Sequence, residues 1–331
     1  MSAESKNVSQ PQSLRDYVSI SLRGFLMGSA DVVPGVSGGT VAFITGIYEA
    51  LIDAINAVNL QFARRLLRFQ WRAAFADFPW QFLLALGIGI GVAVLTMAHF
   101  LSWALTHYET LVWGFFFGLI VASILIVLKR VRRWTPAAVV ILLAFAAAMY
   151  WLVDVTPSKM PHTPLFLFLS GAIAICAMIL PGISGAFILV LLGQYRYVLE
   201  AVVTQDWLTL VIVAAGCAVG LLLFARVLKW LFSHYHDLTV AALIGLMIGS
   251  LRKIWPWKET LLSEVEPDGS IVPLVQQNIL PAALTGEVLA VIGLALLGLL
   301  LVAGVEWLAE RGQSAPKAPG IVEAVEYGAD P

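Results

Sequence analysis

The stretch Asp31-Val-Val-Pro-Gly-Val-Ser-Gly-Gly-Thr40 interrupts an otherwise apolar part of the chain. A shorter copy, Pro181-Gly-Ile-Ser-Gly185, follows in an equally apolar setting. Proline removes an amide donor and glycine loosens the backbone, so both stretches should break a helix. We call them the first and the second break. Broken apolar segments at matching positions of two half-sequences are typical of a transporter's binding site.

The sequence around the breaks is also repeated. Residues 24–48 correspond to residues 171–195, sharing glycines, the Pro-Gly pair, a serine and a tyrosine. Residues 89–124 correspond to residues 216–251, sharing a tryptophan, a His-Tyr pair and several glycines. The offset between the copies differs because the first half carries an extra arginine-rich segment. We therefore expect one structural unit that has been duplicated.

Composition identifies the class of protein. Of 331 residues, 60% are hydrophobic and only 12% are charged, whereas a soluble domain carries about 25% charged residues. The chain is therefore expected to be an integral membrane protein. Its net charge of −1 gives no indication of a nucleic-acid partner. Cys176 and Cys217 lie in apolar runs, so we expect no disulfide framework, no metal site and no cofactor.

The expected fold is an all-α polytopic membrane protein with two inverted-topology repeats, 15–156 and 157–308. Each repeat would combine a re-entrant helical hairpin, broken at a Pro-Gly motif, with three transmembrane helices of about 20 residues. Residues 1–14 and 309–331 are expected to be polar tails, the second of them disordered. The first repeat is divided into a re-entrant pair at 22–56, a basic interfacial helix at 57–77 and spans at 82–105, 110–128 and 136–153. The second is divided into a re-entrant pair at 164–200 and spans at 207–232, 238–251 and 287–308.

The segment 57–77 differs from its surroundings. Arginines alternate there with leucines and aromatic residues at helical spacing, the arginines being Arg64, Arg65, Arg68 and Arg72. This pattern predicts an amphipathic helix in the membrane interface, with its arginines towards anionic headgroups. It would act either as a topology anchor or as a surface that recruits substrate.

Lysine and arginine positions predict the orientation. With a cytoplasmic N-terminus, most of the 20 Lys and Arg residues fall in cytoplasmic segments, as the positive-inside rule requires. Both termini are then cytoplasmic. An odd number of crossings in each half makes the two halves inverted. The same parity follows if each broken segment makes two full crossings, so re-entrant hairpins and thin full spans both remain open.

Each break opens a new helix, whose N-terminal amides and positive dipole end favour an anion. Serine hydroxyls can add donors, and glycines let a phosphate or carboxylate approach the backbone. The alternative is that small residues only allow close helix packing. The residues expected to bind a phosphate are Arg23, Ser37, Gly38, Gly39, Thr40, Ser184, Gly185 and Arg196. Those expected to break the helices are Pro34, Gly35, Pro181 and Gly182.

Charged groups near the breaks have two interpretations each. Asp31 lies three residues before the first break, and Glu49 lies on the helix that leaves it. A carboxylate inside a membrane suggests a site for a coupling ion, or a partner for a helix end or an arginine. Arg23 and Arg196 could bind a phosphate through two parallel hydrogen bonds, or snorkel towards an interface. Coupling to H⁺ or to Na⁺ stays open.

The string Gly28-Ser-Ala-Asp-Val-Val-Pro-Gly-Val-Ser-Gly-Gly-Thr40, followed by Gly46-Ile-Tyr-Glu49 and Leu180-Pro-Gly-Ile-Ser-Gly185, resembles the PopT-type polyprenyl-phosphate translocase family of bacteria. The resemblance covers residues 15–308. It implies a multi-pass protein of the bacterial plasma (inner) membrane that returns undecaprenyl phosphate, the lipid carrier of cell-wall precursors, from the outer to the inner leaflet. The implied partners are undecaprenyl phosphate and membrane lipids, with the oligomeric state open. The second break departs from the pattern, with Ala186 and Phe187 where the first has Gly39 and Thr40.

The expected mechanism is alternating access, in which the two halves rock about the paired breaks. Inward movement of an anion opposes a membrane potential that is negative inside, at about 2.3 kcal/mol per charge per 100 mV. Two alternatives remain. Undecaprenyl-diphosphate phosphatases are similar in their re-entrant repeats, but their motif resembles Pro-Gly-x-Ser-Arg-Ser, whereas Gly38 and Gly185 stand here where arginine would be. The other is an ion-coupled transporter of a small soluble anion.

Overall fold

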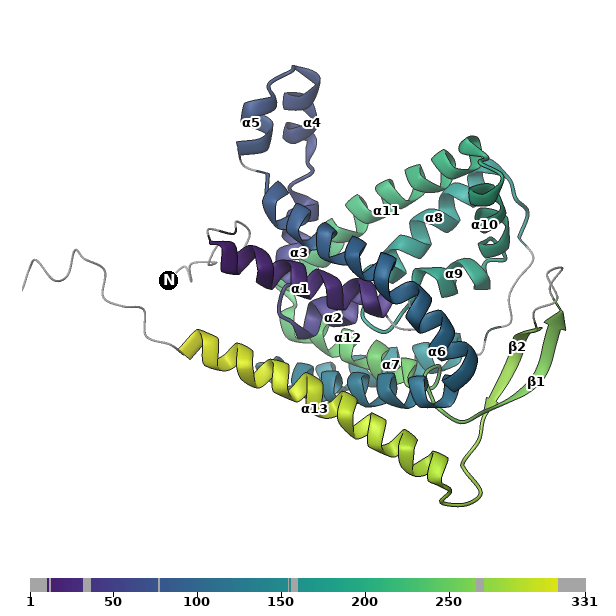
Figure 1. The fold of residues 1–331 in the computed structure, drawn as a ribbon. Coiled ribbons are helices and arrows are strands. Elements are labelled where there is room, and N and C mark those ends of the chain that lie inside the picture. The colour runs from purple at the N-terminus through teal and green to yellow at the C-terminus, as the bar shows by residue number, and fades with distance from the viewer. Residues whose placement is uncertain are drawn as a thin grey trace, which may run out of the picture.

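The computed structural model describes residues 11, 13–31, 37–76, 78–153, 155, 160–265 and 271–314. Pro34, Gly35 and most of both tails lie outside this part. The chain is mostly helical (Figure 1). The first-half helices are α1 Leu14–Asp31, α2 Gly38–Ile44, α3 Tyr48–Asn56, α4 Leu60–Leu67, α5 Trp71–Ala76, α6 Trp80–Leu128 and α7 Pro136–Leu152. The second-half elements are α8 Pro164–Ile179, α9 Gly185–Leu191, α10 Tyr195–Val203, α11 Trp207–His234, α12 His236–Ser250, β1 Lys258–Val265, β2 Ile271–Asn278 and α13 Gly286–Ser314.

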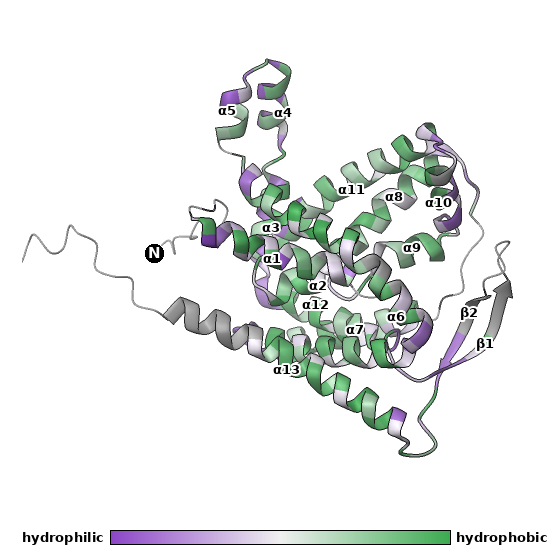
Figure 2. Cartoon of the chain, in the orientation of Figure 1, coloured by the Kyte–Doolittle hydropathy of each residue, from purple (hydrophilic) through white to green (hydrophobic). Residues whose placement is uncertain are grey.

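Several helices are long and apolar enough to cross a bilayer. Four segments of the described chain meet this requirement: Trp80–Met97, Trp103–Leu128, Trp207–His234 and Gly286–Gly304. Two bent helix pairs, α2 with α3 and α9 with α10, raise the number to six if each pair is one span. Figure 2 shows apolar residues along these long helices and hydrophilic ones near helix ends. The chain is a multi-pass membrane protein.

Helix α6 is 49 residues long and bends at Tyr108, whose φ and ψ of −139° and 41° are not helical. We call its parts before and after Tyr108 the first and second arms of α6. Tyr235 has nearly the same angles, −135° and 48°, at the junction of α11 and α12. In each case a tryptophan ring packs edge-on against the tyrosine, with Trp103–Tyr108 and Trp230–Tyr235 centroids both 5.6 Å apart. The repeated sequence therefore adopts the same local geometry twice.

The helices before the breaks also pack alike. Helix α1 lies against the first arm of α6, and α8 lies against α11. At Gly24 the backbone of α1 comes so close to the carbonyl of Leu86 that a methyl group would collide with it. Gly171 of α8 meets the carbonyl of Val213 in the same way. Glycine is needed at both crossings because the backbones touch.

The last helix of each half packs on the opposite half. Helix α7 lies along α12, and α13 lies along the second arm of α6 (Figure 1). Glycines again allow the contacts, Gly118 against Ala295 and Gly245 against Leu142. The two halves of the sequence are therefore interlocked rather than being separate bundles.

The segment expected as one amphipathic helix at 57–77 is instead a helical hairpin, α4 and α5, that projects from the bundle (Figure 1). Phe69 breaks the helix with a positive φ of 56°. The guanidinium of Arg65 donates to the carbonyl of Ala73 at 2.8 Å and ties the two short helices together. The apolar side chains at the turn stay exposed, 80% for Leu67.

The polar segment before α13, which lies between two expected spans, contains an antiparallel hairpin of β1 and β2. Lys258 pairs with Asn278 at its base, and the register is irregular after Thr260. The indole N–H of Trp255 donates to the carbonyl of Ile279 at 2.9 Å, which fixes the entry to the hairpin. The hairpin lies at the end of the bundle away from α4 and α5 (Figure 1).

Candidate functional site

The two breaks are in direct contact. The hydroxyl of Thr40 accepts a hydrogen bond from the amide of Gly182 at 3.0 Å. The hydroxyl of Ser37 donates to the carbonyl of Met178 at 3.1 Å. Ser37 and Thr40 are buried, with 1% and 0% of their surface exposed. We call this set of hydrogen bonds the tip contact; it joins residues more than 140 positions apart.

Glycines make the tip contact possible. Gly39 lies against the carbonyl of Ile179, with no room for a methyl group. Gly182 has a φ of +88°, in the region that favours glycine, and lies close to the carbonyl of Leu246 on α12. The two breaks therefore meet through their backbones, and α12 covers the second one.

The amides that open α2 already have acceptors within the chain. The carboxylate of Asp31 accepts from the amide of Gly38 at 2.7 Å. The hydroxyl of Ser37 accepts from the amide of Gly39 at 3.1 Å, and its carbonyl from the amide of Thr40 at 3.0 Å. This differs from the open anion site expected there. Because a carboxylate and a serine already cap α2, an incoming anion would have to displace Asp31.

The second break is capped differently. Ser184 occupies the N-cap position of α9, yet its side chain makes no cap hydrogen bond. The ammonium of Lys253 lies 5.4 Å from the ring centroid of Phe187, on the first turn of α9. The second break thus combines an uncapped helix start with a nearby cation. Sequence reasoning missed Lys253 because only the packing of α12 on Gly182 brings it to α9.

Each segment after a break bends a second time, at a position where no bend was expected from the sequence. Helices α2 and α3 meet at 113°, as do α9 and α10. Gly46 and Gly193 have positive φ angles of 74° and 66° at these bends. Arg130 donates to the carbonyl of Ile44 at 3.1 Å and so closes the end of α2. The matching glycines in the two copies were the available signal.

Comparisons with known proteins identify the family to which the chain belongs. The VCA0040-like family, described as undecaprenyl phosphate translocase-like, matches residues 27–272, which include both breaks. The chain belongs to this family. The sequence resemblance to a family of polyprenyl-phosphate translocases is thereby confirmed.

Two curated relatives of this translocase-like chain carry the name polyprenyl-phosphate transporter. The protein from Vibrio cholerae serotype O1 is 43% identical over 303 residues, covering 89% of this chain and 98% of its own. The protein from Staphylococcus aureus is 30% identical over 253 residues, covering 71% of this chain and 85% of its own. No solved structure matches the chain.

The remaining charged residues singled out from the sequence lie away from the tip contact of this family member. Glu49 is 67% exposed at the start of α3, and its carboxylate is 3.9 Å from the ring of His236. Arg196 is exposed on α10, beyond the second bend. Arg23 is half-buried on α1, eight residues before Asp31, or about 12 Å along a helix. The structure therefore brings together Asp31, Ser37, Gly38, Gly39, Thr40 and Gly182, and places Ser184 and Gly185 at the adjoining start of α9.

Proposed function

We propose that this protein carries undecaprenyl phosphate from the outer to the inner leaflet of the bacterial plasma membrane, which returns the carrier to cell-wall synthesis. Family membership and the names of the two relatives support polyprenyl phosphate as the substrate. The observation that carries the proposal is the tip contact. It places polar backbone and hydroxyl groups inside an apolar helical body, where a lipid headgroup needs hydrogen-bonding partners to cross.

In this proposal the phosphate binds at the second break. Lys253 supplies the positive charge there, and the hydroxyl of Ser184 and the amide of Gly185 supply donors. The first break stabilises the arrangement from the other side, through Thr40 and Ser37. Arg23 and Arg196 remain proposed guides for the headgroup on its way to and from the breaks.

The proposed architecture is a pair of inverted repeats with re-entrant tips. The recurring kinks at Tyr108 and Tyr235 and the two 113° bends support the duplication. The positive-inside rule supports inversion, with both termini in the cytoplasm. The projecting α4–α5 hairpin then lies along the cytoplasmic leaflet, with its arginines near anionic headgroups.

The interlocked packing changes the expected movement. Since α7 lies on α12 and α13 on the second arm of α6, the two sequence halves are poor candidates for separate rocking bodies. We propose that these four helical segments form a frame. The break-bearing units, α1–α3 with the first arm of α6 and α8–α10 with α11, would move against it. Alternating access then opens each side of the tip contact in turn.

Coupling to H⁺ or Na⁺ is assigned in this proposal to Asp31. Its carboxylate holds the amide of Gly38, and charge-assisted bonds of this kind are among the stronger hydrogen bonds. Neutralising Asp31 with a cation would weaken that bond and release the start of α2. Glu49, paired with His236 instead, is the second choice.

The experiment uses purified protein in proteoliposomes with labelled undecaprenyl phosphate, and measures which leaflet the label occupies over time. We expect rapid exchange that Ser184→Ala slows, while Ser233→Ala, an exposed serine of α11, leaves it unchanged. Exchange no faster than in empty liposomes, with a folded protein, would overturn the proposal. Phosphate release from undecaprenyl diphosphate would then favour the phosphatase alternative, and uptake of a water-soluble anion the other one.

A further inference from the structure

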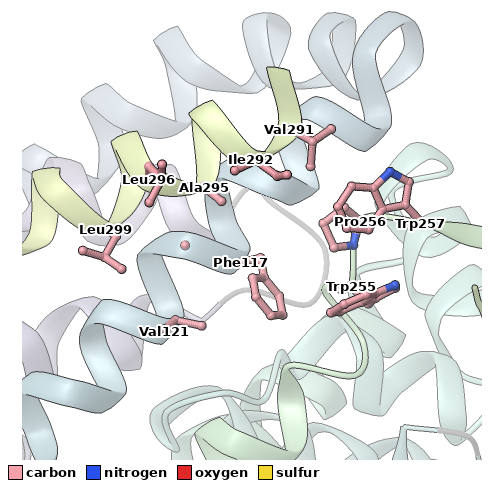
Figure 3. Close-up of a pocket in the computed structure, with 11 residues that line it drawn as sticks. Phe117, Val121, Trp255, Pro256, Trp257, Val291, Ile292, Ala295, Leu296 and Leu299 are labelled. Carbon is pink, nitrogen blue, oxygen red and sulfur yellow. The ribbon is translucent and has the colours of Figure 1, made fainter. Parts of the chain in front are cut away.

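A groove lies between the second arm of α6, α13 and the segment that joins α12 to β1 (Figure 3). Its volume is about 220 Å³. The side chains that line it are apolar or aromatic, and none of them carries a charge. They come from Phe117, Val121, Trp255, Pro256, Trp257, Val291, Ile292, Ala295, Leu296 and Leu299, with Gly118 at the helix crossing.

One wall of the groove is aromatic. Phe117 and Trp255 meet edge-on with ring centroids 5.4 Å apart, and Trp255 contacts Trp257 at 5.6 Å. Because the indole N–H of Trp255 is held by a backbone carbonyl, this wall is fixed in place. The opposite wall is the aliphatic face of α13, where Leu296 is 55% exposed. The groove is therefore open sideways, towards the lipid.

A cation lies at one end of the groove. Trp113 lies one helical turn before Phe117, and the ammonium of Lys258 lies 4.3 Å from its ring centroid. Burial, with the charge of Lys253 as second cause, lowers the pKa of Lys258 to about 8. Lys258 is still largely protonated at neutral pH. Tryptophan-rich segments are typical of the membrane–water interface, the level of lipid headgroups.

The cationic end leads to the second break. The ammonium of Lys258 donates to the carbonyl of Lys253 at 2.6 Å. The side chain of Lys253 in turn lies over Phe187 of α9. Two lysines thus connect the apolar groove with the place where the proposed function puts the phosphate.

We propose that this groove holds the isoprene units nearest the phosphate of the polyprenyl-phosphate substrate, with the phosphate at the Lys258–Lys253 end and the rest of the chain in the lipid. This inference rests on the proposed function. The groove supplies apolar contact for a single chain, and the lysines complement the charge of a phosphate headgroup. Two of its walls, the second arm of α6 and α13, belong to the frame, so these isoprene units stay in place while the break-bearing helices move.

Two adjacent leucines of α13 provide a matched test. Leu296 lines the groove and Leu297 does not, although they are 55% and 52% exposed. Leu296→Trp should fill the groove and weaken equilibrium binding of labelled undecaprenyl phosphate about tenfold, and Leu297→Trp should leave it unchanged. Val121→Trp fills the groove from the α6 side and serves as the second variant. Thermal unfolding shows that each variant is folded.

Chain length separates this inference from the proposed function. Methyl phosphate, which keeps the phosphate and lacks the isoprenoid chain, should bind the wild type and Leu296→Trp equally, because it leaves the groove empty. Equal binding of undecaprenyl phosphate by wild type, Leu296→Trp and Val121→Trp would overturn the groove assignment alone. So would equal competition from phosphatidylglycerol, which would make the groove a general acyl-chain site. If the wild type binds neither phosphate, the proposed function fails and the groove assignment with it.

Discussion

The hydroxyl of Thr40 accepts the amide hydrogen of Gly182 across 142 residues of chain. The glycine has no freedom to turn away, because its φ of +88° and its packing against α12 fix the peptide. One side chain of the first break therefore satisfies a buried backbone donor of the second. In a membrane protein such a bond also lies where water is scarce, so breaking it leaves the amide without a substitute.

Replacing Thr40 by valine removes the hydroxyl and keeps the shape. We expect Thr40→Val to destabilise the protein by about 1–3 kcal/mol, because the amide of Gly182 loses its acceptor. The unfolding temperature and the rate of leaflet exchange should both fall. Thr45→Val is the control, since the hydroxyl of Thr45 at the end of α2 donates, within the described chain, to the carbonyls of Val41 and Ala42 of the same helix. If the two variants behave alike, the bond to Gly182 has no special role.

Gly39 and Gly91 form a second matched pair. A methyl group at Gly39 would meet the carbonyl of Ile179, whereas one at Gly91 has nothing within 4 Å. Gly39→Ala should push the breaks apart, lower the unfolding temperature and slow exchange. Gly91→Ala should stabilise the first arm of α6 by about 0.5–1 kcal/mol, since alanine favours a helix more than glycine. A harmless Gly39→Ala would show that the breaks are not tightly packed.

Much of the site follows from sequence, because a Pro-Gly break is a local property and its repetition reveals the pairing. The structure places Ser37, Thr40 and Gly182 in contact at the two breaks that the sequence singles out. The hydrogen-bond partner of each side chain, however, could not be deduced from the sequence. Asp31 could be interpreted as an ion site or as a helix cap, and only the position of α2 shows that its carboxylate holds Gly38.

Tyr48, at the start of α3, is almost fully buried, and its hydroxyl has no hydrogen-bond partner in the described part of the chain. An unpaired buried hydroxyl costs about 1–3 kcal/mol. Tyr48→Phe should therefore raise the unfolding temperature of this conformation. If the hydroxyl finds a partner in another transport state, exchange slows at the same time. A lower unfolding temperature would indicate that the hydroxyl is already satisfied here.

The stability of the protein should depend on pH through Lys258. Its pKa of about 8 in the folded state lies below the ordinary 10.5, mainly because of burial. The unfolded chain therefore binds more protons between these values, so the contribution of Lys258 to stability rises with pH across that window. Lys258→Met should be more stable than wild type near pH 7, and the difference should shrink by pH 10. Lys229→Met, at an exposed ion pair with Asp53, is the control for the loss of a lysine side chain.

Three features of the fold differ from what the sequence led us to expect, each for its own reason. The single helix expected at 57–77 is a hairpin because Phe69 adopts a positive φ. A phenylalanine in a sequence gives no indication of such a backbone conformation. The β1–β2 hairpin did have a signal, since Asp268-Gly269 between two apolar runs is typical of a tight turn. The exchange of α7 and α13 between the halves depends on contacts between helices far apart in the chain. The hydrophobic periodicity of a helix does not indicate which distant helix it packs against.

The most direct test measures leaflet exchange of labelled undecaprenyl phosphate for wild type, Lys253→Gln and Lys229→Gln in the same proteoliposomes. Both variants lose one lysine charge, but only Lys253 lies at the second break. The account predicts fast exchange for wild type and Lys229→Gln, and about tenfold slower exchange for Lys253→Gln, as expected when one charged hydrogen bond to a phosphate is lost. Equal rates for the two variants would contradict a phosphate site at the second break.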